Sequence, residues 1–244
     1  MREIGFLVGP RTGEVLPQIG FSTVSLGTKK GVPVQSCQCK GLESETKKWA
    51  SEDLALYRKG EPAKTTSLLV NALIAQDVHA LSLLDIGGGI GIVQLELLSA
   101  GAIAVTSVEA STAYIHVARE EAARAAREHQ ITYVHGDFVS LADTIPEADI
   151  VTLDRVICCY DNVKALVSLS ASKARRLYGV VYPRSIWWVK ILLFFENMGY
   201  WLRRSPFRAF VHSSELVNQL IQEAGLAVVY HKHTLTWQVV VYRR

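Results

Sequence analysis

Residues 83–97 read LLDIGGGIGIVQLEL, which is a short apolar run followed by an acid, a glycine-rich loop and a helical pattern. Glycines adopt backbone angles that a side chain would forbid, and they let a ligand approach the chain closely. In the dinucleotide-binding pattern Gly-x-Gly-x-x-Gly, counted from Gly87 and Gly89, the third glycine falls at position 92. That residue is Ile92, and the glycine stands at Gly91 instead. The loop therefore departs from a pyrophosphate-binding loop by one residue.

Acidic residues at the ends of three predicted strands favour a different ligand. Asp85 precedes the loop, where its carboxylate would repel a pyrophosphate but could orient an ammonium group, directly or through water. Glu109 ends the second strand, and a carboxylate there can accept hydrogen bonds from both hydroxyls of a ribose. In HGDF (135–138), Asp137 could accept from an exocyclic amine while Phe138 offers an apolar face to a purine. Together these residues predict a ligand with an amino-acid end, a ribose and an adenine.

Short apolar runs alternate with helical patterns from residue 82 to the end of the chain. Strands are predicted over 82–86, 103–110, 130–137, 148–154 and 176–183, with two more between 226 and 244. Helices are predicted over 43–58, 65–76, 92–100, 111–129, 162–175, 186–201 and 214–224. This alternation indicates a parallel sheet covered by helices on both faces. The last two strands have only a short connection, near residues 231–234, and must therefore run antiparallel.

The composition favours one large domain in a reducing compartment. The chain has 244 residues, 49% of them hydrophobic, and a formal charge of +3 from 26 basic and 23 acidic residues. This balance does not indicate a nucleic-acid partner, which usually needs a basic patch. Four cysteines are too few for a disulfide scaffold of this length, and the N-terminus lacks the apolar core of a signal peptide, so a cytoplasmic location is expected. Cys37, Cys39, Cys158 and Cys159 do not have the usual zinc-ligand spacing, and no metal is predicted.

Four segments together resemble the class I S-adenosylmethionine-dependent methyltransferases. They are LLDIGGGIG (83–91), SVEAS (107–111), HGDF (135–138) and IVTLDRV (150–156). The resemblance implies a Rossmann-like α/β fold with a seven-stranded, mostly parallel sheet, its last strand antiparallel, and helices on both faces. It also implies S-adenosyl-L-methionine as the methyl donor.

Carried over residue by residue, the resemblance implies a donor site at the ends of the strands. The implied donor-site residues are Asp85, Gly87, Gly88, Gly89, Gly91, Glu109, Ala110, Asp137, Phe138, Asp154 and Arg155. The acid and the glycines of the first segment would hold the methionine part, and the second segment the ribose. The third segment would hold the adenine, and the fourth would lie beside the methyl group.

Further segments, among them LDRVICCY (153–160) and YPRSIWWVK (182–190), resemble a bacterial group of small-molecule methyltransferases. That group is often labelled by likeness to magnesium-protoporphyrin O-methyltransferase. The resemblance implies a small organic acceptor with apolar or aromatic parts, and it favours methylation of oxygen. Enzymes that methylate amines of nucleic acids or glutamine carry Asn/Asp-Pro-Pro-aromatic after the fourth strand. Residues 154–157 read DRVI here, which disfavours those targets.

Two alternatives to this enzyme stay open. One is a non-catalytic module that only binds S-adenosylmethionine, and the less favoured one is an NAD-dependent oxidoreductase. Methyl transfer depends chiefly on alignment, so the sequence does not require a catalytic side chain. Tyr160 and His212 are the candidates if the acceptor needs a base.

The sequence divides into a flexible arm over 1–36, a helical cap over 37–80 and the donor-binding domain over 81–244. Residues 186–201 are the most apolar stretch, but they are too short to span a bilayer, which needs ~20 mostly apolar residues. Their aromatic side chains are predicted to pack as core and as a wall for the substrate. A peripheral contact with an anionic membrane surface is the alternative, because basic residues surround the stretch.

Overall fold

The computed structural model describes residues 39–244, with side chains from Glu45 onward. The predicted arm over 1–36 and the side chains of Cys37 and Cys39 lie outside the described residues. Within residues 39–244, no helix is both long enough and apolar enough to cross a membrane.

A seven-stranded sheet forms the centre of the described chain. Its strands are β1 (Ser82–Ile86), β2 (Ala104–Glu109), β3 (Ile131–His135), β4 (Ala148–Asp154), β5 (Ala174–Pro183), β6 (Ala227–His233) and β7 (Trp237–Arg243). The spatial order is β3-β2-β1-β4-β5-β7-β6. Strands β1 to β5 pair in parallel, whereas β7 runs antiparallel to both β5 and β6. The predicted fold class is confirmed.

Helices connect the strands and cover the sheet. They are α1 (Cys39–Arg58), α2 (Lys64–Ile74), α3 (Ile92–Ser99), α4 (Thr112–Arg124), α5 (Phe138–Leu141), α6 (Val163–Ser172), α7 (Trp187–Leu202) and α8 (Ser214–Glu223). Single 3-10 turns lie at Glu128–Gln130, Ala142–Thr144 and Ile157–Cys159. The prediction of one helix over 111–129 was wrong beyond residue 124, because Ala126 has a left-handed backbone (φ 53°) that ends the helix.

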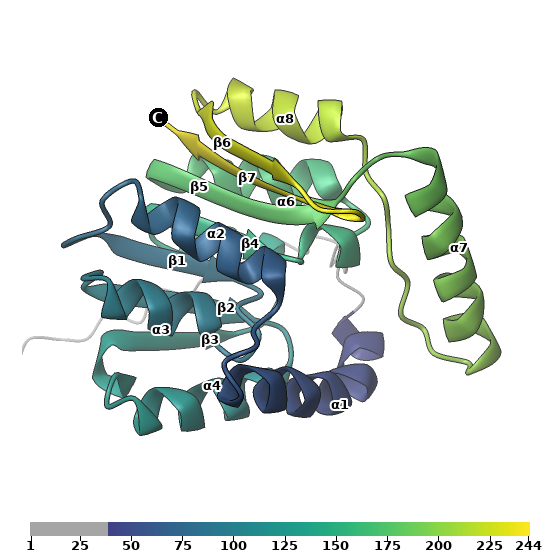
Figure 1. Cartoon of the computed structure of the whole chain (residues 1–244), viewed down its shortest axis with the longest axis horizontal. Coiled ribbons are helices and arrows are strands. Elements are labelled where there is room, and N and C mark those ends of the chain that lie inside the picture. The colour runs from purple at the N-terminus through teal and green to yellow at the C-terminus, as the bar shows by residue number, and fades with distance from the viewer. Residues whose placement is uncertain (1–38) are drawn as a thin grey trace, which may run out of the picture. The chain divides into compact units, whose positions relative to one another are not determined.

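Two apolar cores lie on opposite faces of the sheet (Figure 1). Helices α2, α3 and α4 pack on one face, and α5, α6 and α8 pack on the other. Neighbouring strand residues alternate between the cores, so that Leu83 enters the first and Leu84 the second, and both are fully buried. Burial on both faces explains why these strands read as continuous apolar runs.

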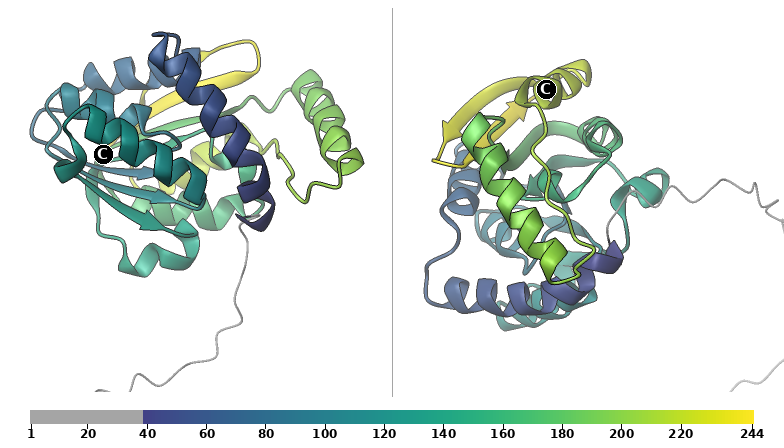
Figure 2. Two further views of the ribbon diagram at one scale, coloured as in Figure 1. Left: turned by 90° about the horizontal axis from the view of Figure 1, so that it is seen from below. Right: turned by 90° about the vertical axis from the view of Figure 1, so that its right-hand side faces the viewer.

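Helix α1 packs along α4 and is joined to it by polar contacts at three levels (Figures 1 and 2). The hydroxyls of Thr46 and Ser111 lie 2.7 Å apart. The hydroxyl of Tyr114 donates to Asp53 at 3.0 Å. Near the end of α1, the guanidinium of Arg58 donates twice to the carboxylate of Glu121, which is 2% exposed. This row of contacts fixes α1 over the carboxyl ends of β1 and β2.

We expect Glu121→Gln to loosen α1 without unfolding the sheet. The substitution removes the charge that holds Arg58, and charge-assisted hydrogen bonds are about twice as strong as neutral ones. Hydrogen exchange should then speed up for the amides of residues 45–58 and stay unchanged in β1 and β4. Glu120→Gln is the matched control, because Glu120 is exposed, pairs with His116 on its own helix and acts on Arg58 more weakly than Glu121 does. Equal exchange in the two variants would contradict this account of α1.

Candidate functional site

A cavity of about 450 Å³ opens at the carboxyl ends of β1, β2 and β4. Strands β1 and β4 are neighbours at the point where the chain changes direction across the sheet, which is where open α/β sheets bind ligands. Every donor-site residue predicted from the sequence lines this cavity, with the exception of Gly91. Gly91 is the N-cap residue of α3, between Ile90 and Ile92, which do line the cavity.

The glycine loop lies directly on the carboxylate of Asp85. This side chain is fully buried, and it accepts hydrogen bonds from Thr152 at 2.7 Å and from Gln94 at 2.9 Å. A Cβ at Gly88 would lie 2.4 Å from Asp85 Oδ2, so only glycine lets the loop descend this far. Burial raises the pKa of Asp85 to about 6, and the two hydrogen bonds lower it in part. The contacts of Asp85 hold the loop from beneath.

Gly87 shows why the turn needs a glycine. Its φ is +65°, and an added Cβ would lie 2.5 Å from a methyl group of Val156. The backbone N–H of Gly87 donates to the carbonyl of Val108 at 2.7 Å, which joins the loop to β2. The loop therefore leaves a backbone surface without side chains facing the cavity.

Glu109 is held by backbone donors at the end of β2. Its Oε2 accepts from the N–H of Gly89 at 3.1 Å, and its Oε1 accepts from the N–H of Ser111 at 2.9 Å. The side chain is 5% exposed, and burial raises its pKa to about 7 against the effect of these backbone hydrogen bonds. Each carboxylate oxygen keeps a further lone pair for a ligand hydroxyl.

Asp137 and Phe138 lie at the end of β3, as the sequence predicted. Phe138 is 3% exposed and lines the cavity. Asp137 caps α5 by accepting from Ser140, and it also accepts from the hydroxyl of Tyr160 at 2.8 Å. The candidate base Tyr160 thus donates its proton toward an acid of the cavity wall.

Asp154 and Arg155 form a charged pair on the opposite wall. Arg155 Nε lies 3.7 Å from Asp154 Oδ1, and Asp154 Oδ2 accepts from Thr66 at 2.5 Å. Burial raises the pKa of Asp154, while Arg155 and Thr66 lower it in part. Asp154 Oδ1 is buried without a hydrogen bond. The negative charge of Asp154, which lines the cavity, suits a ligand with a positive charge.

The other candidate base, His212, is not among the residues that line the cavity. Its Nε2 lies 2.8 Å from the carbonyl oxygen of Tyr160, and burial lowers its pKa. His212 therefore fastens the segment before α8 to the turn after β4. Cys158 and Cys159 do line the cavity, with their sulfurs 3.6 Å apart, and both lie near the carbonyl of Arg155.

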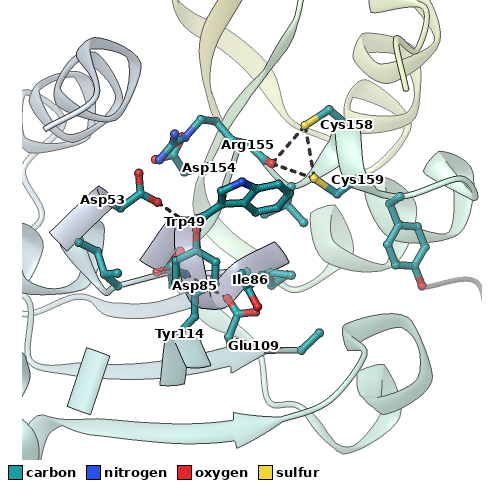
Figure 3. Close-up of a pocket in the computed structure, with 18 of the residues that line it drawn as sticks. Trp49, Asp53, Asp85, Ile86, Glu109, Tyr114, Asp154, Arg155, Cys158 and Cys159 are labelled. Carbon is teal, nitrogen blue, oxygen red and sulfur yellow. Dashed lines mark hydrogen bonds and ion pairs between the residues drawn. The ribbon is translucent and has the colours of Figure 1, made fainter. Parts of the chain in front are cut away.

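The outer walls of the cavity come from α1 and α7, within the cap predicted over 37–80 and the substrate wall predicted over 186–201, but the sequence did not identify the individual side chains. Trp49 and Asp53 on α1 face the strand ends (Figure 3). Leu193 and Tyr200 on α7, with Phe207 in the segment that follows, form an apolar wall. The individual residues could not be predicted, because no local motif indicates which apolar residues border an opening.

The cavity is strongly acidic. Among the described residues that line it, seven carry carboxylates and one, Arg155, carries a permanent positive charge. The carboxylates belong to Glu52, Asp53, Asp85, Glu109, Asp137, Asp154 and Glu196. This environment favours a cationic ligand over a pyrophosphate.

The fold and this site define a class I S-adenosylmethionine-dependent methyltransferase, as predicted from the sequence. The model of the O-methyltransferase domain matches residues 44–177, which is more than half of the chain. The chain therefore belongs to the O-methyltransferase domain family. No curated protein sequence matches it.

Solved structures share the fold at low identity. Magnesium protoporphyrin IX methyltransferase from Synechocystis, with bound SAH, is 22% identical, with a TM-score of 0.61 over 74% of this chain and 82% of that one. An O-methyltransferase family protein from Burkholderia thailandensis is 12% identical, with a TM-score of 0.60 over 73% of this chain and 55% of that one. The pyocyanin biosynthetic protein PhzM is 20% identical, with a TM-score of 0.52 over the same shares of the two chains.

We expect Glu109→Gln to weaken binding of S-adenosylhomocysteine by about 1.5–3 kcal/mol, the contribution of hydrogen bonds to a charged group. The pH profile should change as well. A ribose diol donates to the ionised carboxylate, whose pKa is about 7 in the free protein. Binding below that pKa requires loss of a proton, so affinity should fall by up to about tenfold per pH unit as the pH decreases.

Calorimetry between pH 6 and 8 checks both effects. The part of the slope that comes from Glu109 should disappear in Glu109→Gln, because the amide does not titrate. Any slope from Asp85 should remain, since that carboxylate keeps its contacts with Thr152 and Gln94. An unchanged affinity and slope in the variant would remove Glu109 from the ligand site.

We expect Gly87→Val to abolish binding of S-adenosylhomocysteine while the far-ultraviolet circular dichroism spectrum is kept. The new side chain would force the loop away from Val156 and into the cavity. Gly60→Val is the control, because Gly60 has a similar φ of +77° but has open space around its Cβ position and lies outside the cavity. Retained binding in Gly87→Val would mean that the loop does not contact the ligand.

Proposed function

We propose that this protein transfers a methyl group from S-adenosyl-L-methionine to an oxygen atom of a small, apolar or aromatic acceptor. One observation carries the proposal: an acidic cleft at the ends of the strands continues, within one cavity, into an aromatic wall. The acidic part suits a sulfonium donor with an ammonium group, and the aromatic part suits the acceptor.

In this proposal the strand ends hold the donor. Glu109 accepts from the ribose hydroxyls, and the carboxylate of Asp154 attracts the ammonium group. Phe138 lies against the adenine. The glycine loop passes beneath the methionine part, where a side chain at Gly87 would collide with Val156. Asp85 acts from below by positioning the loop.

In this proposal the protein aligns the donor and the acceptor and keeps water out of the site. When bound, the donor supplies a methyl group that already carries its chemical driving force. An in-line displacement forms the bond from acceptor oxygen to methyl carbon and breaks the bond from that carbon to sulfur. Trp49 of α1 covers the cavity and excludes water, while the walls hold the acceptor oxygen opposite the sulfur.

The acceptor part of the cavity favours a flat or apolar molecule. Trp49, Tyr200 and Phe207 pack edge to face around it, with ring centroids 5.3 and 5.1 Å apart for the two pairs that include Phe207. The Synechocystis enzyme named for magnesium protoporphyrin IX has a large, flat acceptor, which supports the same acceptor class here. A carboxylate oxygen needs no base, and this agrees with the engagement of Tyr160 by Asp137 and of His212 by a carbonyl.

The test is transfer of label from methyl-labelled S-adenosylmethionine into a cell extract that has been separated into water-soluble and organic-soluble fractions. We expect a labelled product in the organic-soluble fraction, released as methanol by mild alkali if a carboxylate is methylated and stable to alkali if a phenol is methylated. Gly87→Val serves as the inactive control.

Two results would contradict the proposal. Label only on nitrogen or carbon, or only on nucleic acid or protein, would exclude this acceptor class. S-adenosylhomocysteine binding without transfer to any fraction would favour the non-catalytic binding module.

A further inference from the structure

Helix α7 exposes a continuous apolar face. Trp187, Ile191, Phe194, Phe195, Met198 and Leu202 follow one another at spacings of three, four or one residues, and so share one side of the helix. Each is between 40% and 73% exposed. In Figures 1 and 2, α7 lies at the edge of the described fold, with the extended chain that follows it between α7 and the sheet. A contiguous apolar surface of this kind marks an interaction site.

The opposite side of α7 belongs to the substrate cavity. Val189 is fully buried, and Leu193, Glu196 and Tyr200 line the cavity. Glu196 both lines the cavity and is exposed to solvent, so the cavity opens along this helix. The apolar outer face and the acceptor wall are therefore opposite sides of the same helix.

The charges around this face have one dominant sign. Lys190, Arg203 and Arg204 are exposed beside it, and Glu196 is the only acid between residues 186 and 212. Glu196 accepts from the hydroxyl of Tyr200 on the cavity side. The positive charge of Lys190 contributes to lowering the pKa of Glu215, at the start of α8. The two arginines at the end of α7 give the face its net positive charge.

We propose that the outer face of α7 docks on an anionic lipid bilayer, with the helix in the plane of the surface. A helix of 16 residues is about 24 Å long, too short to span but suited to lie in the interface. Trp187 and Trp201, near its two ends, belong to the residue type that prefers this interface. A second copy fits less well, because it would offer the same positive charges and not the anionic groups that complement Lys190, Arg203 and Arg204.

This orientation leaves α7, about 10–12 Å across, between the membrane surface and the acceptor wall on its other side. Because the cavity opens along this helix, the acceptor is a lipid-soluble molecule that leaves the bilayer and enters past α7, a conclusion that rests on the proposed function. The docking itself does not depend on it, because vesicle binding is measured without any methyl transfer.

The experiment is sedimentation of the full chain with vesicles of phosphatidylcholine containing phosphatidylglycerol. We expect the chain to bind these vesicles more strongly than vesicles of pure phosphatidylcholine. The double variant Phe194→Gln/Trp201→Gln should bind about tenfold or more weakly, since each substitution removes a large apolar side chain. Arg203→Gln/Arg204→Gln should reduce binding to anionic vesicles only, by about 1 kcal/mol per arginine, or roughly fivefold each. Ile103→Gln is the matched control, because Ile103 is 56% exposed, like Phe195, but precedes β2 at the other end of the sheet.

Calorimetry with S-adenosylhomocysteine should give the same affinity in all these variants, none of which alters a residue lining the cavity. Absence of vesicle binding, or equal loss in Ile103→Gln, would overturn the proposal. A dimer in analytical ultracentrifugation that dissociates in the Phe194/Trp201 variant would assign the face to a second copy instead. If the protein binds vesicles but the methylated product is found only in the water-soluble fraction, entry of the acceptor from the bilayer would be overturned and the docking would stand.

Discussion

The site depends on a buried carboxylate beneath a backbone that has no side chains. Asp85 ends β1 inside the protein, and its two oxygens are held by Thr152 from β4 and Gln94 from α3. These contacts join the strands on either side of the cavity to the helix that follows the loop. Because Gly88 rests against the carboxylate, the loop cannot move closer to the core without displacing Asp85.

The remaining walls of the cavity come from helices α1 and α7, which are attached to the rest of the fold in different ways. Helix α1 is attached by hydrogen bonds and one ion pair to α4, whereas α7 contributes apolar side chains from a helix with few buried residues. An acidic cleft and an aromatic wall meet where these helices approach the strand ends. The proposed donor contacts thus come from the sheet, and the proposed acceptor contacts from the two helices.

Most of the fold could be predicted from the sequence, as could the gathering of the predicted donor-site residues around one cavity. The strands and the glycine loop are local patterns in the sequence. Parallel pairing brings Asp85, Glu109 and Asp137 to one edge of the sheet, and this does not depend on where the helices between the strands end. The predicted end of α4 was wrong because Ala126 has a left-handed backbone that ends the helix. The sequence around it is rich in alanine, which favours helix. The fixed contacts of Tyr160 and His212 could not be predicted, because each binds a partner that is distant in the sequence.

By itself, the sequence determined the order of strands and helices, the bend that excludes side chains and the acids at the strand ends, because each depends on neighbouring residues. Only the tertiary structure decided that Asp85 supports the loop from below and that Trp49 and Tyr200 border one cavity. It also decided that α7 has one side on the cavity and the other in solvent. These properties arise from packing between distant segments, and an apolar residue has the same sequence pattern whether its neighbour is core, ligand or solvent.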